Sequence, residues 1–402
     1  MKFSPLVKRI SGEGADAWLT HYDASAARDR GEDVIILSVG DPDLDTPPAV
    51  VAKAIERLQA GDTHYCPARG RLALREAIAV AHAKRTGQAT QADNVVFLSG
   101  AQNALFVASL CTTGPGDEII SFDPMYPTYP ATLQASGAQM VRAPTKDNFR
   151  PDLAGLAASI TEHTRAIVWA TPNNPTGVIL NESELEAIGR LAERHDLWLI
   201  SDEVYAGLAP GGHIPGLAAR MPERVITLGS LSKSHAMTGW RAGWLVGPAQ
   251  LATHAESLIM CMLFGAPGFI QEAAITALSI APEAERRIRD YCEVRRTRMV
   301  AELADIPRIR TVVPEAGMFM LVDVRQTGLS GYEFMRALYA SERVSVLDGA
   351  AFGRETAGFV RLCFATDEAS IAAACGRIKR FVQSAVNGAK LDGTKTPLER
   401  RL

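Results

Sequence analysis

The feature that most constrains the fold of this chain is an alternation of short apolar runs with longer segments of helical spacing. The short runs are rich in valine and isoleucine, and they cover residues 94–100, 117–124, 138–144, 165–172, 196–203 and 224–230. Between several of them the apolar residues recur every three or four positions, as in residues 183–196. Strands that alternate with helices form a largely parallel sheet covered on both sides. We therefore predict an α/β protein with a mostly parallel central sheet flanked by helices.

The rest of the chain predicts a second, smaller α+β domain. A long charged helix with an apolar stripe is expected within residues 283–306, where it would connect the two domains. Further strand patterns follow it, on either side of a helix at 331–342. The expected division is an N-terminal segment that packs with the small domain, a large domain, the small domain and a loose tail, at residues 1–45, 46–285, 286–386 and 387–402.

Composition narrows the functional classes. A formal net charge of -3 over 402 residues leaves no basic surface of the kind that nucleic-acid binding requires. The six cysteines lie far apart without a CxxC pair, which argues against a disulfide framework and against structural zinc. The first residues lack the apolar core of a secretory signal, and the longest apolar stretch, 258–270, is too short to cross a bilayer. We expect a cytoplasmic protein with no metal, membrane or nucleic-acid partner.

Small and polar residues follow four of the expected strands at the point where each strand ends. They are Gly100 to Gln102, Asn173 and Asn174, Asp202 and Tyr205, and Ser230 to Lys233. In open parallel sheets, ligands bind beyond the carboxyl ends of the strands. We therefore expect these residues, distant in sequence, to meet along one rim of the sheet.

Each of these residues has an ordinary structural explanation when it is taken alone. Lys233 is explained as a solvated loop residue, Asp202 as a cap of the following turn and Arg241 as half of a surface ion pair. Together they favour a sharper interpretation. A lysine that can form a Schiff base, a phosphate cradle completed by Ser230 and Arg241, and a carboxylate for a ring nitrogen are what pyridoxal phosphate requires.

Six motifs in a fixed order extend this interpretation to a family. They are LSVGDPDLDTP, HYCPARGRLALREAIA, TPNNPTG, SDEVY, SLSKSHAMTGWRAGW and VRLCFA, between about Ser38 and Ala365. The chain resembles the class I/II aminotransferases of fold type I. This resemblance implies a pyridoxal-phosphate-dependent enzyme that exchanges an amino group between an L-amino acid and a 2-oxo acid.

The resemblance also implies roles for individual residues around the cofactor ring. Lys233 would be the catalytic residue, which binds the cofactor aldehyde covalently and later moves the substrate proton. Asp202 would pair with the ring nitrogen, while Tyr205 and Asn174 would hydrogen-bond the phenolic oxygen. Tyr126 would stack on the ring, although an aromatic residue in such a loop is often plain core.

Two further sites are implied at the ends of the cofactor and the substrate. The phosphate would be held at a helix start by backbone and side-chain donors, namely Gly100, Ala101, Gln102, Ser230 and Arg241. A tyrosine matching Tyr65 reaches the phosphate from the neighbouring subunit in this family, which implies a homodimer. Arg361 would clamp the substrate α-carboxylate, assisted by Asn174 and the backbone at Gly40.

The amino donor is less tightly constrained. Family members that use aspartate carry a lysine beside the phosphate turn, where this chain has Ala101. Five segments resemble family members that act on arginine with pyruvate, namely RISGEGADAW, LSKSHAMTGWR, ESLIMCMLFG, AGMFMLVD and RVSVLDGAAFG. We therefore expect arginine or another basic amino acid as donor. The candidate carboxylates for its guanidinium are Glu13, Asp16, Asp23 and Asp348.

Three alternatives remain open on the sequence. The first keeps the reaction but changes the donor, as in an aspartate, alanine or aromatic aminotransferase. The second is a pyridoxal phosphate lyase, which eliminates a substituent rather than exchanging the amino group. The third is a non-catalytic aminotransferase-like sensor module, which the short and non-basic segment before the cofactor motifs disfavours.

Overall fold

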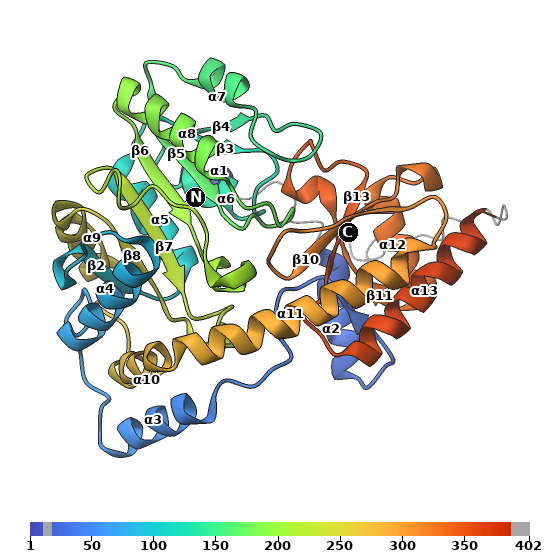
Figure 1. Ribbon diagram of the computed structural model, residues 1–402, viewed down its shortest axis with the longest axis horizontal. Coiled ribbons are helices and arrows are strands. Elements are labelled where there is room, and N and C mark those ends of the chain that lie inside the picture. Colours follow the sequence, from blue (N-terminus) through green and yellow to red (C-terminus); the bar gives the residue numbers. More distant parts are fainter. Residues whose placement is uncertain (11–17, 387–402) are drawn as a thin grey trace.

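The computed structural model describes residues 1–10 and 18–386, and it forms two lobes (Figure 1). The larger lobe holds a seven-stranded sheet in the order β2-β8-β7-β6-β5-β3-β4. Its strands are β2 (Val95–Leu98), β3 (Glu118–Phe122), β4 (Gln139–Ala143), β5 (Thr164–Ala170), β6 (Trp198–Asp202), β7 (Val225–Ser230) and β8 (Gly243–Val246). Only β8 runs against its neighbours, so the predicted mostly parallel sheet is confirmed. The strand at 243–246 was not predicted from the sequence.

Helices cover both faces of this sheet because successive side chains of each strand point to opposite sides. In β5, Ala166 and Val168 join one core and Ile167 and Trp169 join the other. The first core is closed by α5 (Ala101–Thr112), α6 (Tyr129–Gln134) and α9 (Ala249–Met262). The second is closed by α7 (Leu153–Ser159) and α8 (Glu182–His195). The central strands β5, β6 and β7 are therefore buried on both faces, and polar groups collect where the strands end.

The smaller lobe is built on a four-stranded antiparallel sheet in the order β12-β13-β10-β9. Its elements are β9 (Arg310–Val312), β10 (Phe319–Asp323), α12 (Gly331–Glu342), β12 (Leu347–Asp348), β13 (Phe359–Cys363) and α13 (Glu368–Val386). The helix predicted at 331–342 is confirmed. It begins at a capping box in which Ser330 and Glu333 bond each other's backbone amides. The smaller α+β unit predicted from the sequence is thus present.

The helix predicted within 283–306 is α11 (Ala281–Ala304), and it runs from one lobe to the other (Figure 1). Its buried residues include Ile288, Tyr291, Met299 and Leu303, which form the expected apolar stripe. The domain boundary expected between residues 285 and 286 falls inside this helix. The helix belongs to both lobes, and the division of the chain into domains stays a prediction.

The N-terminal residues divide between the two lobes. A short strand, β1 (Ile35–Ile36), pairs with β11 (Val344–Ser345) of the small lobe, and α2 (Leu19–Asp29) contacts α12. By contrast, α1 (Pro5–Ile10) contacts α6 of the large lobe. Next, α3 (Pro48–Gln59) packs on α10 (Gly268–Ser279), as does α4 (Leu72–Thr86), which is followed by Gly87 as its C-cap residue.

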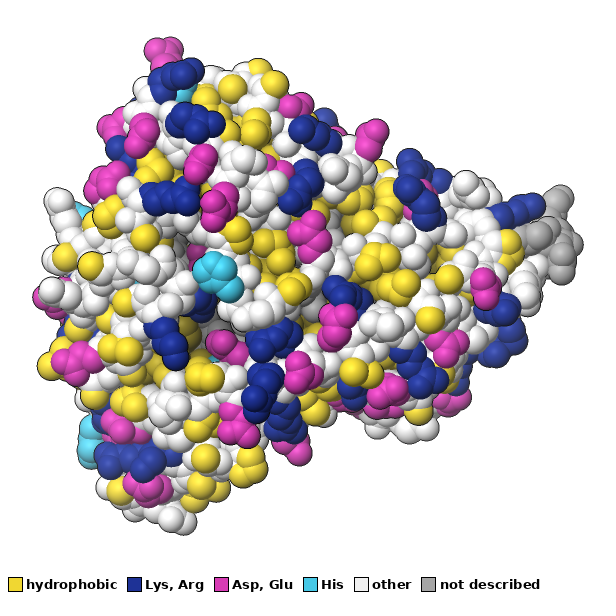
Figure 2. Space-filling model, viewed as in Figure 1, with side chains coloured by type: hydrophobic (Ala, Val, Ile, Leu, Met, Phe, Trp, Pro, Cys, Tyr) yellow, Lys and Arg dark blue, Asp and Glu magenta, His cyan; other side chains and the backbone are white. Residues whose placement is uncertain are grey.

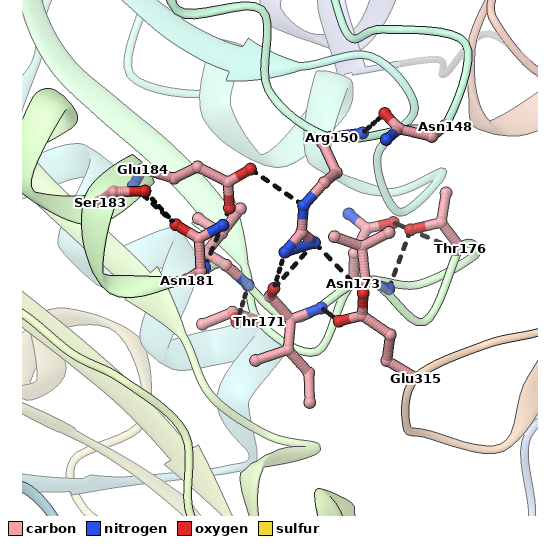
Figure 3. A network of polar contacts seen from close by, with 12 residues as sticks. Asn148, Arg150, Thr171, Asn173, Thr176, Asn181, Ser183, Glu184 and Glu315 are labelled. Atoms are coloured by element: carbon pink, nitrogen blue, oxygen red, sulfur yellow. Dashed lines mark hydrogen bonds and ion pairs between the residues drawn. The ribbon is translucent and has the colours of Figure 1, made fainter.

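A polar network ties the small lobe to the turn between β5 and α8 (Figure 3). Arg150 lies 3.1 Å from the carboxylate of Glu184 and 3.2 Å from that of Glu315. Glu315 belongs to the segment that leads into β10, and its other oxygen accepts the amide of Ile179 at 2.8 Å. The turn that carries Asn174 is therefore held from both lobes.

Charged side chains of both signs are interspersed on the face drawn in Figure 2, with no continuous basic surface there. The helices described for this chain include none with the length and apolar character that crossing a membrane demands.

The start of α8 offers a test of the local stability of this frame. Asn181 caps the helix by accepting the amide of Glu184 at 2.9 Å, and Glu184 returns the bond to the amide of Asn181. Asn181→Ala should lower the free energy of unfolding by about 1 kcal/mol, because the amide of Glu184 loses its side-chain acceptor. Denaturant unfolding of cofactor-saturated protein measures the change. Ser183→Ala, which removes an exposed hydroxyl beside the same cap, should cost clearly less.

Candidate active site

A cavity of about 200 Å³ lies where the strand ends of the large sheet face β10 and β13 of the small lobe. The structure brings most of the sequence-predicted residues to its wall. They are Gly40, Ala101, Gln102, Tyr126, Asn174, Asp202, Tyr205, Ser230, Lys233, Arg241 and Arg361. Gly100 directly precedes this group as the N-cap residue of α5. The expectation that these distant residues meet at one rim is therefore met by the geometry.

Asp202 ends β6, and its partly buried side chain lines the cavity. Oδ2 accepts a hydrogen bond from the Tyr129 hydroxyl at 2.6 Å, and Oδ1 accepts the amide of Val204 at 3.2 Å. Burial raises the pKa of Asp202, and these two bonds oppose the rise. No basic side chain of the described residues forms an ion pair with it. A ligand with a positively charged ring nitrogen would supply the missing partner.

Lys233 follows β7 and extends into the same cavity, where its Nζ donates to the Gly40 carbonyl at 2.5 Å. Burial lowers the pKa of this amine, and the cations Arg361 and Arg241 lower it further. The neutral amine is the form that attacks a carbonyl carbon and accepts a proton. The surroundings of Lys233 therefore favour the chemically reactive form.

One end of the cavity is suited to a phosphate. The helix α5 starts there with no side-chain cap, so its first amides are available to an anion. Gly100 has φ 88°, and a Cβ at this position would collide with the guanidinium of Arg241. Ser230 lies opposite, with its hydroxyl 3.0 Å from the carbonyl oxygen of Ala242. Glycine is thus required for the close approach of arginine to the helix start.

Arg361 lies at the other end, on β13, and it is 1% exposed. Its guanidinium stacks on the rings of Phe319 at 3.9 Å and Phe352 at 4.8 Å. It donates to the Asn174 side-chain oxygen at 3.0 Å and to the Ser38 carbonyl at 2.6 Å. Burial lowers its pKa to about 10, so it stays charged at neutral pH.

Arg361 lacks a counter-charge. No carboxylate of the described residues forms an ion pair with it, and its Nε is buried without a hydrogen-bond partner among those residues. A buried cation that is hydrogen-bonded only to neutral oxygens is costly. An incoming carboxylate would supply both the charge and the missing acceptor.

Two tyrosines lie between these ends. Burial raises the pKa of Tyr126 and that of Tyr205, so both hydroxyls stay protonated and can donate hydrogen bonds. The ring of Tyr205 packs edge-on against Phe319 at 6.0 Å. The cavity therefore offers donors and aromatic surface along its length, with an acid at one edge and cations at the two ends.

Three residues of the site were missed by sequence reasoning. Tyr129 binds Asp202, Phe319 supports Arg361, and Trp18 forms part of the cavity wall. Tyr129 stands three residues after Tyr126 in the segment DPMYPTYP, which holds two tyrosines and three prolines. Nothing in this pattern showed which tyrosine would face Asp202. Trp18 ends the segment RISGEGADAW, but nothing in that segment showed that its indole would line the cavity.

Some residues that were named from the sequence do not line this cavity. Tyr65 is 86% exposed and does not line this cavity; it packs against Phe264 at a ring distance of 4.8 Å. Asp23 lies 3.5 Å from Arg336, and Asp348 turns to the amide of Ala350 at 3.1 Å. Neither lines the cavity, so the expectation that they receive a guanidinium there is corrected. The other two candidates, Glu13 and Asp16, lie outside the described residues.

The donor set fits pyridoxal phosphate. A carboxylate without a cation faces the cavity at Asp202, an amine of lowered pKa lies at Lys233, and an uncapped helix start faces Arg241. These are the partners that a pyridine nitrogen, an aldehyde and a phosphate require. The described part of the chain holds no cluster of three residues suited to a metal ion.

Comparison with known proteins agrees with this chemistry. Residues 32–378 match the family model of class I and II aminotransferases. The chain is 48% identical to the arginine–pyruvate transaminase AruH of Pseudomonas aeruginosa, over 94% of this chain and 97% of that protein. It is 34% identical to an aspartate aminotransferase of Pyrococcus horikoshii, over 88% and 91% of the two chains. The solved aspartate aminotransferase of Thermus thermophilus with maleate superposes with a TM-score of 0.89 at 30% identity, covering 95% of this chain and all of that one.

The chain therefore belongs to the class I and II aminotransferases. It has the fold type I architecture and is a pyridoxal-phosphate-dependent enzyme that transfers an amino group from an amino acid to a 2-oxo acid. The resemblance noted in the sequence is confirmed at the level of the family.

Because Asp202 has no cationic partner among the described residues, replacing it should have opposite effects on the stability of the cofactor-free protein and on its affinity for the cofactor. Because burial raises its pKa, holding the charge at neutral pH costs stability in the cofactor-free protein. Asp202→Asn should leave the melting temperature of the cofactor-free form equal or higher. The same change should weaken cofactor binding about 10- to 100-fold, because a charge-assisted bond is lost. A variant that is destabilised without cofactor and binds it normally would contradict this account.

Proposed function

We propose that this aminotransferase takes its amino group from arginine or another basic L-amino acid and passes it to pyruvate. The observation that carries the α-amino acid part is Arg361, a buried cation without a counter-charge that faces the cavity beside Asn174. The donor and acceptor rest on the 48% identity to a protein named arginine–pyruvate transaminase. Ala101, at a position where aspartate-using relatives resembling this chain carry lysine, supports a donor other than a dicarboxylate.

The chain's own residues divide the work between binding and proton movement. When bound, the cofactor supplies an aldehyde and an electron-withdrawing ring. Lys233 would hold the aldehyde at rest and, once released as a neutral amine, would remove the proton from the substrate α-carbon and return it on the cofactor side. Asp202, held by Tyr129, would keep the ring nitrogen protonated. The hydroxyl of Tyr205 and the amide of Asn174 would donate to the ring oxygen.

Binding at the two ends would fix the geometry of this proton transfer. Arg361 would hold the α-carboxylate with its planar fork of donors, assisted by Asn174 and the backbone of Gly40. The first amides of α5, with Arg241 and Ser230, would hold the phosphate. Tyr126 would stack on the ring. With both ends fixed, the α-carbon stays within reach of Lys233.

A donor screen tests the proposed function. Purified holoenzyme is assayed with pyruvate or 2-oxoglutarate against arginine, lysine, ornithine, aspartate and phenylalanine. Arginine with pyruvate should give a kcat/KM at least about 10-fold above that of aspartate or phenylalanine. Alanine and the 2-oxo acid of arginine should form in equal amounts without free ammonia. Faster turnover of aspartate or phenylalanine would reject the donor, and steady ammonia release would favour a lyase.

We also propose that the active enzyme is a homodimer in which Tyr65 reaches the phosphate of the neighbouring subunit. The high exposure of Tyr65, outside its own cavity, supports this arrangement. Exposed apolar residues on nearby elements also suit burial by a second copy, among them Ile55, Leu58, Met260, Leu263 and Phe264. A cytoplasmic location is proposed as well, supported by six cysteines that are all unpaired.

Hybrid dimers test the shared site. A Lys233→Ala subunit is assembled with a Tyr65→Ala subunit, with a different affinity tag on each. If Tyr65 acts in the neighbouring site, one site of the hybrid has both native residues and activity should recover to about half that of the wild-type dimer. If Tyr65 acts only within its own subunit, the hybrid should not exceed half the activity of the Tyr65→Ala homodimer. The two parent variants assayed alone serve as controls.

A further inference from the structure

The cavity offers a substrate side chain aromatic surface rather than a free carboxylate. Among the described residues that line it, Asp202 is the only acid. Asp202 already accepts a hydrogen bond from Tyr129 and is assigned to the ring nitrogen of the cofactor. Asp23 and Asp348 are turned elsewhere. Among the described residues, the partner that this part of the cavity offers a cationic substrate side chain is an aromatic ring.

Trp18 is the lining residue best suited to that role. It precedes α2, is half-buried, and packs against the small cluster of Leu347 and Phe352. Both cluster members adjoin Arg361: Leu347 pairs with it across the β12–β13 ladder, and the ring of Phe352 lies 4.8 Å from its guanidinium. The indole is thus supported by the same side chains that support the carboxylate-binding arginine. The side chain of a substrate held by Arg361 would therefore lie in the part of the cavity that Trp18 lines.

The surroundings of Trp18 are compatible with a cation. Its nearest ring neighbour is His21, which meets it edge to face at a centroid distance of 5.6 Å and an interplanar angle of 83°. The ring nitrogen of His21 bonds the Ser38 hydroxyl at 2.9 Å, and burial lowers the pKa of this histidine. His21 is therefore neutral at neutral pH and does not repel a positive charge near the indole. The other four aromatic residues of the lining already have partners or roles. Phe319 stacks on Arg361 and Tyr129 bonds Asp202, while Tyr126 and Tyr205 are assigned to the cofactor.

We propose that Trp18 is a specificity-determining residue that stacks on the guanidinium of the amino donor. This inference rests on the proposed function, since it explains how a basic donor would be chosen over a neutral one of equal length. A guanidinium is planar and weakly hydrated, and tryptophan attracts cations most strongly among the aromatic residues. Stacking also leaves the guanidinium edges free to keep their water. Loss of such a contact in a partly desolvated site reduces binding about 5- to 30-fold.

The test compares arginine with citrulline, which has the same length and shape but a neutral urea group. Holoenzymes of the wild type, Trp18→Leu and Trp18→Phe are assayed with pyruvate as acceptor. Trp18→Leu should lower kcat/KM for arginine about 10-fold and leave that for citrulline within about 2-fold. Trp18→Phe should fall between, because phenylalanine keeps a weaker aromatic face. The ratio of the two substrates is the readout that a merely structural role would not change.

Tyr22→Leu is the matched control, because Tyr22 is an exposed aromatic residue on the same helix and does not line the cavity. It should leave the arginine-to-citrulline ratio unchanged, and cofactor content and melting temperature report on folding for all variants. Equal losses for both substrates in Trp18→Leu, or no loss for either, would overturn the role of Trp18 while wild-type arginine activity persisted. A wild type that ignores arginine but turns over another donor would instead reject the proposed function.

Discussion

A single buried cation organises the site. Arg361 reaches the cavity from β13 between two phenylalanine rings, and it is held by neutral oxygens of Asn174 and Ser38. Those oxygens orient the guanidinium but do not neutralise it. The protein therefore has an unneutralised positive charge at the junction of its lobes, which favours the binding of an anion. A substrate carboxylate would neutralise this charge and accept its hydrogen bonds, so binding there is strong and directional.

Among the described residues, ionisable groups without a partner of opposite charge also lie at the cofactor end of the cavity. Asp202 is a carboxylate of raised pKa without a cation, and Lys233 is an amine of lowered pKa that donates to the backbone carbonyl of Gly40. Each group is unfavourable in the empty cavity and favourable once its partner arrives. The opposite pKa shifts follow from one cause, the low polarity of the surroundings, acting on an acid and on a base. At both ends of the site, groups that lower the stability of the protein alone raise its affinity for a ligand.

Much of this could be predicted from sequence because the motifs sit at strand ends, where a parallel sheet gathers them. Asp202 and Lys233 required only the order of strands and helices to be placed near each other. Tyr129 and Trp18 could not be found in this way, because their roles depend on how a short helix and an N-terminal segment dock. Asp23 and Asp348 show the converse error. A carboxylate in a loop near a site was treated as available, yet one is paired with Arg336 and the other caps a turn.

The contacts between the lobes fix the positions of these groups relative to one another. Asn174, which touches Arg361, belongs to a turn whose Gly177 carbonyl accepts the amide of Ala316 at 3.1 Å from the small lobe. Gly177 has φ 73°, and a Cβ there would collide with Pro314, so the two segments approach more closely than any other residue allows. The Arg150 network fastens the same segments a few residues away. The arginine that reads the carboxylate is thereby fixed relative to the lysine that acts on the α-carbon, and that fixed relation is what proton transfer at one carbon requires.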